Sequence, residues 1–252
     1  MPTYSAEAIV LRRANFGEAD QVVTLLTRFQ GKIPAVAKGV RKMGSRKGGN
    51  LDLLNHIKAH LAEGKNMDLI TEVDLISAFP ELKKDLSKIT LAYQIVESVD
   101  KLMTDNQEND QVFRLTREAL QLLESSAKPE LIIYSFQLKL LSLLGFQPEL
   151  RQCVRCGKQL EPGGLAISAE LGGVIGPEER EHDVTAFPVS PEIVKAWRFL
   201  LAAPLTDAPK LHLAPAVASR LQSSIQYYLE YVLERDLHSP ELSRQVRKLS
   251  TS

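Results

Sequence analysis

The residues with the clearest chemistry are the cations of one short stretch. From Arg28 to Lys58 the sequence has eight Lys and Arg residues against a single anion, Asp52, so the stretch carries a formal charge of +7 in a chain of zero net charge. Lys and Arg release the condensed counterions of a phosphate backbone, and glycine amides can approach a phosphate closely. The stretch therefore indicates either a phosphate-binding loop or a solvated basic loop.

The centre of this stretch changes character at Gly39. From Gly31 to Ala37 the apolar residues alternate with others, which predicts a strand. From Lys38 to Gly49 the sequence is rich in Lys, Arg and Gly, which predicts a flexible loop. We expect this loop to be the part that binds phosphate.

A second group with possible chemistry is the Cys-x-x-Cys-Gly motif of Cys153 and Cys156. Two thiolates with this spacing supply half of a tetrahedral zinc site, but the chain has no further cysteine. His182 with Glu179 or Asp183 would complete only an unusual ligand set. The favoured interpretation is a turn without metal, in which hydrogen bonds keep the knuckle shape.

No stretch of the sequence is typical of catalysis. It contains no Gly-x-Ser-x-Gly elbow, no phosphate loop of the Walker type and no His-Glu-x-x-His motif. The five histidines show no ligand spacing. His56 and His60 share one face of a predicted strand with Lys58, where they either contact phosphate or are simply exposed. We therefore predict a protein that is not an enzyme and has no cofactor.

The bulk composition is that of a globular protein. The chain has 252 residues, of which 44% are hydrophobic and 25% charged, enough for two or three small domains. No apolar run approaches the roughly 20 residues that span a bilayer, and the N-terminus does not resemble a signal peptide. These features predict no membrane association and a cytoplasmic location.

The N-terminal third reads as β structure. Tyr4 to Leu11 and Val22 to Leu26 are apolar runs separated by turn residues. Odd-numbered positions are apolar from Leu51 to Leu61 and again from Met67 to Leu75, which predicts a hairpin with one buried face. Five short strands without room for crossover helices favour a small barrel, most commonly the five-stranded OB-fold.

Helical periodicity begins near Leu86. It predicts amphipathic helices on both sides of an exposed acidic loop at residues 104–110, then a buried helix that ends at Gly145. Ser190, followed by Pro191, predicts the start of a later helix, and a long helix follows Pro215. The fold class is α+β, with these expected parts: OB-fold domain 1–80, helical domain 81–150 and 189–238, an insertion of irregular or small β structure at 151–188, and a polar tail 239–252.

The order of several motifs resembles the RecO family of bacterial recombination mediators. The most specific motif is Ala37-Lys38-Gly39-Val40-Arg41-Lys42, and the resemblance extends over essentially the whole chain. Further matching segments are Glu7 to Leu11, Gly17 to Asp20, Leu25 to Thr27, Gly31 to Ile33, Leu144 to Phe146, the Cys-x-x-Cys-Gly motif and Leu171 to Ile175.

The resemblance implies an N-terminal OB-fold and a helical domain with a zinc-finger-like insertion. It also implies binding of single- and double-stranded DNA, annealing of complementary strands, and loading of the RecA recombinase together with RecR on DNA coated by single-stranded-DNA-binding protein. No cofactor is implied. The implied DNA contacts are Arg12, Lys32, Lys38, Arg41, Lys42, Arg46, Lys47 and Lys58.

The sequence departs from the family in two places. A second Cys-x-x-Cys would fall on Gly176 and Glu179, so the zinc site is half absent. A pocket for the acidic tail of single-stranded-DNA-binding protein needs basic groups beside apolar ones. The candidate tail-binding cations are Arg114, Arg117, Lys128 and Lys139.

Two alternatives remain open at this stage. One is an OB-fold protein that binds RNA, and the other is an adaptor whose basic loop binds an acidic protein tail. Phe29 is the only aromatic residue at the edge of the basic stretch, which predicts affinity that is electrostatic and does not depend on base stacking.

Overall fold

The computed structural model describes the backbone of residues 2–43, 45 and 47–249, and the side chains of these residues up to 234. The chain divides into two compact units, Met1–Phe136 and Gln137–Ser252. The boundary between the units falls inside helix α5 (Pro129–Leu143).

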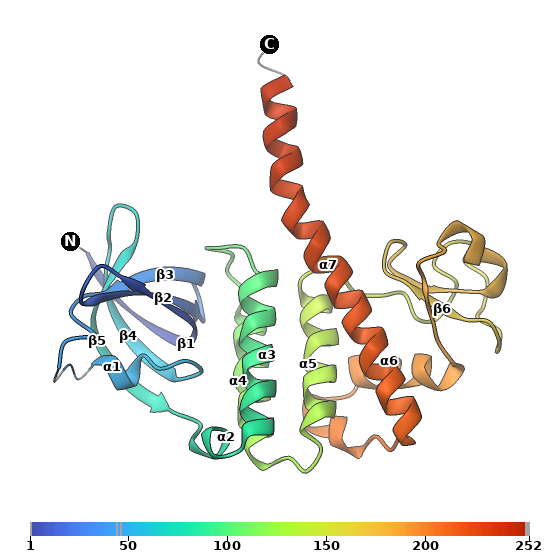
Figure 1. Cartoon of the computed structure of the whole chain (residues 1–252), viewed down its shortest axis with the longest axis horizontal. Helices are drawn as coiled ribbons and strands as arrows, with labels where there is room; N and C mark the ends of the chain where they lie inside the picture. Colours follow the sequence, from blue (N-terminus) through green and yellow to red (C-terminus); the bar gives the residue numbers. More distant parts are fainter. Residues whose placement is uncertain (1, 44, 46, 250–252) are drawn as a thin grey trace. The chain divides into compact units, whose positions relative to one another are not determined.

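The first unit begins with a closed barrel of five strands (Figure 1). Its strands are β1 (Thr3–Phe16), β2 (Asp20–Thr27), β3 (Gly31–Ala37), β4 (His56–Ala62) and β5 (Asp68–Ser77), in the order β1-β2-β3-β5-β4. Only β3 and β5 pair in parallel, and the other pairs are antiparallel. The predicted α+β class with an OB-fold-like barrel is confirmed.

Alternation along the strands decides which side chains fill this barrel. On β2 and β3 every second residue is apolar and buried, including Val23, Leu25, Ile33, Ala35 and Ala37. Successive side chains of a strand point to opposite faces, so the residues between them lie on the outside. Burial of this apolar set is the main stabilising contribution to the barrel.

The predicted register of β5 is wrong in part. Val73 lies opposite Ala59 as the odd-position pattern requires, but Thr71 is an extra residue at a β-bulge, and Ile70 lies opposite Leu61. Ile70 is therefore fully buried instead of Leu69, which was predicted inside, whereas Leu75 keeps the predicted register opposite Ile57 and is nevertheless 45% exposed. A bulge shifts the side-chain alternation by one residue, and the odd-position pattern does not reveal it.

The predicted strand from Leu51 also begins too early. Residues Lys47–Asn50 form a short helix, α1, and β4 begins only at His56. Leu51 is fully buried, but it lies in the turn between the two elements. Leu51 is therefore an apolar core residue of a turn, although the odd-position pattern predicts it as part of a strand.

Three helices follow the barrel in the first unit: α2 (Pro80–Lys84), α3 (Leu86–Leu102) and α4 (Asp110–Ser125). The side chain of Asp85 accepts hydrogen bonds from the amides of Ser87 and Lys88 and so caps α3. Asn109 caps α4 through the amide of Val112. The helical periods predicted for these segments are confirmed.

The loop between α3 and α4 lies against the start of β3. The amide of Asn106 donates to the carbonyl of Lys32 at 2.8 Å. Gly31 has φ +72°, and a Cβ atom there would lie 2.1 Å from the carbonyl oxygen of Gln107. Only glycine fits at this approach, and the loop is thereby held on the barrel.

The second unit contains the end of α5, then α6 (Pro191–Ala202) and α7 (Pro215–Leu249). The Ser190 side chain caps α6 through the amide of Ile193, as predicted. Trp197 of α6 is fully buried, and its Nε1 donates to Ser224 Oγ of α7 at 3.0 Å. The backbone of α7 is helical to Leu249 and so continues into the segment predicted as a polar tail, residues 239–252.

Residues between α5 and α6 form a small three-stranded sheet. Its strands are β6 (Ala166–Ser168), β7 (Gly173–Ile175) and β8 (Phe187–Pro188), with β6 in the centre. Gly173 pairs with Glu149, and a Cβ at Gly173 would lie 2.5 Å from the Glu149 carbonyl oxygen. This sheet occupies the segment in which the sequence predicted irregular or small β structure.

Candidate nucleic-acid interface

Three of the predicted DNA contacts lie together on the turn that follows β3. Lys38, Arg41 and Lys42 are all exposed. Gly39 has φ +65° and allows the chain to reverse, and its carbonyl accepts from the Lys42 amide at 3.1 Å. None of the three cations forms an ion pair with a carboxylate of the described residues. Their charge is therefore available to an external anion.

This turn is held on the hairpin between β1 and β2. The amide of Gly39 donates to Asp20 Oδ1 at 2.7 Å, and the amide of Arg41 donates to the Ala19 carbonyl at 3.0 Å. The Arg41 guanidinium reaches the Gly17 carbonyl at 3.4 Å. The cations thus project from one turn that is held against the β1–β2 turn at one end of the barrel. We name residues 38–43 the basic turn.

The loop predicted to extend to Gly49 is shorter. Gly48 and Gly49 lie in α1, which is attached to β5 because Lys47 Nζ donates to the Ile70 carbonyl at 3.2 Å and Asn50 Nδ2 donates to the Val73 carbonyl at 3.0 Å. The ammonium group of Lys47 therefore has a partner inside the protein. Arg46 lies outside the described residues.

Lys32 does not belong to a surface for DNA. Its side chain is buried, and Nζ donates to the Asp100 carbonyl at 2.6 Å. The same ammonium lies 3.5 Å from the Asp100 carboxylate and 3.4 Å from that of Asp105. Its charge attaches β3 to α3 and the following loop, and this corrects the sequence-based assignment.

Arg12 and Lys58 lie apart from the basic turn. The Arg12 side chain is 64% exposed, with Nε 3.2 Å from Asp100 Oδ2 on α3. Lys58 is exposed on β4, where its neighbours across the two strand pairs are Glu7 and Asp74. Each cation therefore stands beside carboxylates, which weakens its attraction for phosphate.

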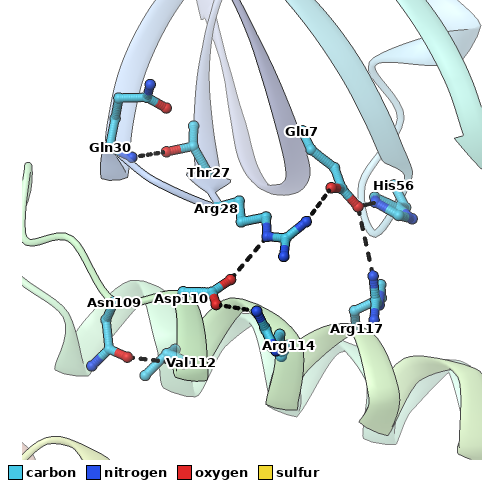
Figure 2. A network of polar contacts seen from close by, with 10 residues as sticks. All are labelled: Glu7, Thr27, Arg28, Gln30, His56, Asn109, Asp110, Val112, Arg114 and Arg117. Carbon is cyan, nitrogen blue, oxygen red and sulfur yellow. Dashed lines mark hydrogen bonds and ion pairs between the residues drawn. The ribbon is translucent and has the colours of Figure 1, made fainter.

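Arg114 and Arg117, two of the cations expected to bind an acidic tail, take part in a network between the barrel and α4 (Figure 2). Arg114 contacts Asp110 at 2.7 Å, and Arg117 contacts Glu7 at 3.7 Å. Lys139 Nζ donates to the Leu201 carbonyl at 2.8 Å, and Lys128 also has an interaction within the chain. Each of the four cations thus already has a partner within the chain.

Glu7 is the centre of this network. One carboxylate oxygen accepts from His56 Nε2 at 2.8 Å, and the other lies 3.5 Å from Arg28, which in turn contacts Asp110 at 3.0 Å (Figure 2). The hydrogen bond from Arg114 and that from Arg28 hold the pKa of Asp110 below its usual value. The network joins β1, β4 and the turn after β2 to α4.

The predicted surface position of His56 is wrong. Its side chain is buried beside Phe113 of α4, with ring centroids 6.0 Å apart. Burial lowers the pKa of His56, and the Glu7 hydrogen bond opposes this shift in part. His60 is partly exposed and lies between Ser5 at 2.9 Å and Asp74 at 3.2 Å. Both histidines thus have partners inside the barrel unit.

The cysteine motif borders a cavity of about 430 Å³ in the second unit. Cys153 is buried and Cys156 is exposed, and Gly176 and Glu179 line the same cavity. Burial raises the pKa of the Cys153 thiol, but backbone amides of Cys156, Gly176 and Arg155 donate to it and lower the pKa overall. Two backbone hydrogen bonds, Cys153 to Lys158 and Gly157 to Cys153, close the turn.

These residues do not fit a tetrahedral zinc ion. Gly176 has no ligand atom in its side chain, and the Glu179 carboxylate lies 2.8 Å from Arg155 Nε. Within the described ranges, no three His, Cys, Asp or Glu side chains are grouped as a metal site. The two thiols therefore have no complete ligand set.

One exposed aromatic residue was missed by sequence reasoning. The sequence predicts Phe16 among the turn residues between Leu11 and Val22, and it gives Phe29 as the only aromatic residue at the edge of the basic stretch. In the structure Phe16 is the last residue of β1, it is 52% exposed, and it lies opposite Asp20. The sequence signal that could have located Phe16 is the turn at Gly17. If the two flanking segments pair across this turn, Phe16 lies opposite Asp20 and next to the basic turn.

The closed five-stranded barrel with cations on one end defines a protein of the OB-fold class. The family described as "Recombination protein O N terminal" matches residues 1–79, and "Recombination protein O C terminal" matches residues 83–241. The chain belongs to the RecO family of DNA repair proteins.

Similar proteins agree with this membership over nearly the whole chain. A protein of Roseiflexus sp. named DNA repair protein RecO is 35% identical over 246 residues, covering 98% of this chain and 87% of the relative. A protein of Symbiobacterium thermophilum with the same name is 32% identical over 250 residues, covering 98% of this chain and 99% of the relative. A protein of Bifidobacterium longum, also named DNA repair protein RecO, is 35% identical over 245 residues, covering 96% of this chain and 99% of the relative.

Over the described part of the chain, no helix combines the length and the apolar character that a membrane span needs.

Proposed function

We propose that this protein is a recombination mediator that holds DNA through its phosphate groups. It binds single- and double-stranded DNA, anneals complementary strands and helps to load the RecA recombinase on DNA coated by single-stranded-DNA-binding protein. It performs no chemical turnover, needs no cofactor or metal, and acts in the bacterial cytoplasm at the nucleoid. Membership of the RecO family supports this role.

The observation that carries the proposal is the basic turn. Lys38, Arg41 and Lys42 are exposed, and no carboxylate of the described residues lies within ion-pair distance of them. Two backbone amides of the turn, those of Gly39 and Arg41, donate to the Asp20 carboxylate and the Ala19 carbonyl of the β1–β2 hairpin and hold the turn in place. Cations on such a turn contact phosphate without reading base edges, which suits a protein that brings two strands of any sequence together.

The proposed protein partners are RecR and the acidic C-terminal tail of single-stranded-DNA-binding protein. Arg114, Arg117, Lys128 and Lys139 are weak candidates for the tail, because each already has a partner within the chain. Titration of a labelled tail peptide against the full chain tests this partner. Absence of saturable binding would remove it from the proposal.

DNA binding should depend strongly on salt. If the three cations of the basic turn each neutralise one phosphate of a single strand, the slope of log K against log salt is about −2. Affinity for a short oligonucleotide should then fall roughly 15-fold between about 50 and 200 mM salt. Fluorescence anisotropy over this range measures the slope. A slope near zero would contradict phosphate binding by these cations.

A further inference from the structure

An aromatic side chain lies on the outer surface of the barrel, next to the basic turn. Val23, Ala35 and Ala37 of β2 and β3 point into the barrel core. Val22 and Val36 alternate with them and are only partly buried, so they lie on the outer face. Ala14 and then Phe16 continue this outer face on β1, because Ala14 pairs with Val22 and Phe16 with Asp20.

The strand register brings Phe16 close to the cations. Gln21 pairs with Ala37, so the next residues outward, Asp20 and Lys38, follow in the same register. Residues opposite each other in an antiparallel pair project to the same face, and Phe16, Asp20 and Lys38 therefore share one face. The hydrogen bond of 2.7 Å from the Gly39 amide to Asp20 Oδ1 agrees with this placement.

The opposite end of this outer face is covered by a helix. There Arg12 of β1 and Lys32 of β3 both contact Asp100 of α3. At the hairpin end Ala14 is exposed, and Phe16 is 52% exposed. A large aromatic ring with half of its surface in water, beside three cations, has the composition of a site for unpaired bases.

The charges around Phe16 also orient a ligand. Lys38, Arg41 and Lys42 attract a phosphate backbone to the basic turn. Glu18, exposed at the hairpin tip, repels it from the tip, while the Asp20 carboxylate already accepts a backbone amide. The backbone of a nucleic acid is thus directed to the turn, and the ring is left to face a base.

We propose that Phe16 stacks on an unpaired base of a DNA strand whose phosphates lie on Lys38, Arg41 and Lys42. This contact makes the site prefer single strands to duplex, because a paired base offers no free face to the ring. The inference rests on the proposed DNA binding and adds to it a preference for single-stranded DNA, with base stacking on Phe16 as the cause.

The test compares an oligothymidylate with an abasic strand of the same length and charge. Phe16→Ala should weaken binding to oligothymidylate by about tenfold. It should leave binding to the abasic strand within about twofold and the salt slope unchanged, because no phosphate contact is removed. Phe29→Ala is the matched control: Phe29 is 57% exposed in the turn at the other end of β2, and neither affinity should change.

The possible outcomes separate this inference from the function on which it rests. If the wild-type protein binds neither strand, DNA binding itself fails. If it binds both strands equally, or if Phe16→Ala weakens both equally, DNA binding stands and stacking by Phe16 is wrong. A Phe16→Trp variant should keep its affinity and lose tryptophan fluorescence on binding oligothymidylate but not the abasic strand. Unchanged fluorescence would also overturn the inference.

Discussion

Replacing both Arg41 and Lys42 with glutamate should weaken binding to single-stranded DNA by about 100-fold, because two phosphate contacts are lost and two repulsive charges are added. Both side chains are exposed, and the anchoring hydrogen bond of Arg41 to Ala19 is made by its backbone amide. The variant should therefore fold normally. Fluorescence anisotropy gives the affinity, and thermal unfolding confirms the fold.

The control for this variant is Lys84→Glu with Lys101→Glu, which changes the net charge by the same amount. These side chains are 69% and 55% exposed on α2 and α3, away from the barrel turns. If the control loses as much affinity as the Arg41 and Lys42 variant, binding depends on overall charge, and the basic turn has no special part in it.

Replacing Glu7 with alanine should lower the free energy of unfolding by about 2 to 3 kcal/mol. The substitution removes the one carboxylate that His56, Arg28 and Arg117 share (Figure 2). It leaves His56 buried without its hydrogen-bond acceptor. The effect is smaller than for a fully buried pair, because the Glu7 side chain is 28% exposed. Denaturant unfolding measures the difference.

The loss of stability caused by Glu7→Ala should grow as the pH falls from about 7.5 to 5.5. Burial lowers the pKa of His56 in the folded protein below its usual value of 6.5. As the pH falls below 6.5, His56 therefore binds more protons in the unfolded chain than in the folded one, and the free energy of unfolding decreases. Without Glu7 the pKa of His56 falls further, and the decrease becomes steeper. A difference that is constant with pH would contradict a role for His56 in this network.

Asp74→Ala is the matched control for the Glu7 variant. Asp74 is also a carboxylate on an outer strand position of the barrel, and it also contacts a histidine, His60, at 3.2 Å. Its side chain is 70% exposed. Its removal should cost less than about 0.5 kcal/mol, because exposed ion pairs contribute little.

The barrel could be predicted from the sequence where a strand alternates without interruption. On β3 the residues Ile33, Ala35 and Ala37 fill the core as their spacing indicates. On β5 the extra residue Thr71 shifts the pattern, so the prediction holds for Val73 and fails before the bulge, where Ile70 is buried instead of Leu69. A local pattern specifies which face is buried only as long as the register is regular.

The candidate site was predictable in composition but not in geometry. A count of charges does not distinguish Lys38, which is exposed, from Lys32, whose ammonium is held by Asp100 of α3. Asp100 is 68 residues away in the sequence, and no local rule connects the two. Phe16 was missed for a similar reason, because its position beside the basic turn depends on pairing across three strands.

The departure at the cysteine motif, in contrast, was visible in the sequence. The resemblance to the family implied a second pair of cysteines at the positions of Gly176 and Glu179, and the structure brings both residues to the cavity of Cys153 and Cys156. Because Glu179 already pairs with Arg155, the arrangement leaves the two thiols without the remaining ligands. That the insertion folds without metal stays a prediction.

Phosphate contacts of the basic turn are proposed to bring two DNA strands together on this protein. The most direct test is the rate at which two complementary labelled oligonucleotides anneal, followed by fluorescence transfer at low salt with no nucleotide added. The wild-type protein should accelerate annealing well above the spontaneous rate, and the Arg41→Glu, Lys42→Glu variant should not. A wild-type rate equal to the spontaneous rate, or equal acceleration by both proteins, would contradict the account.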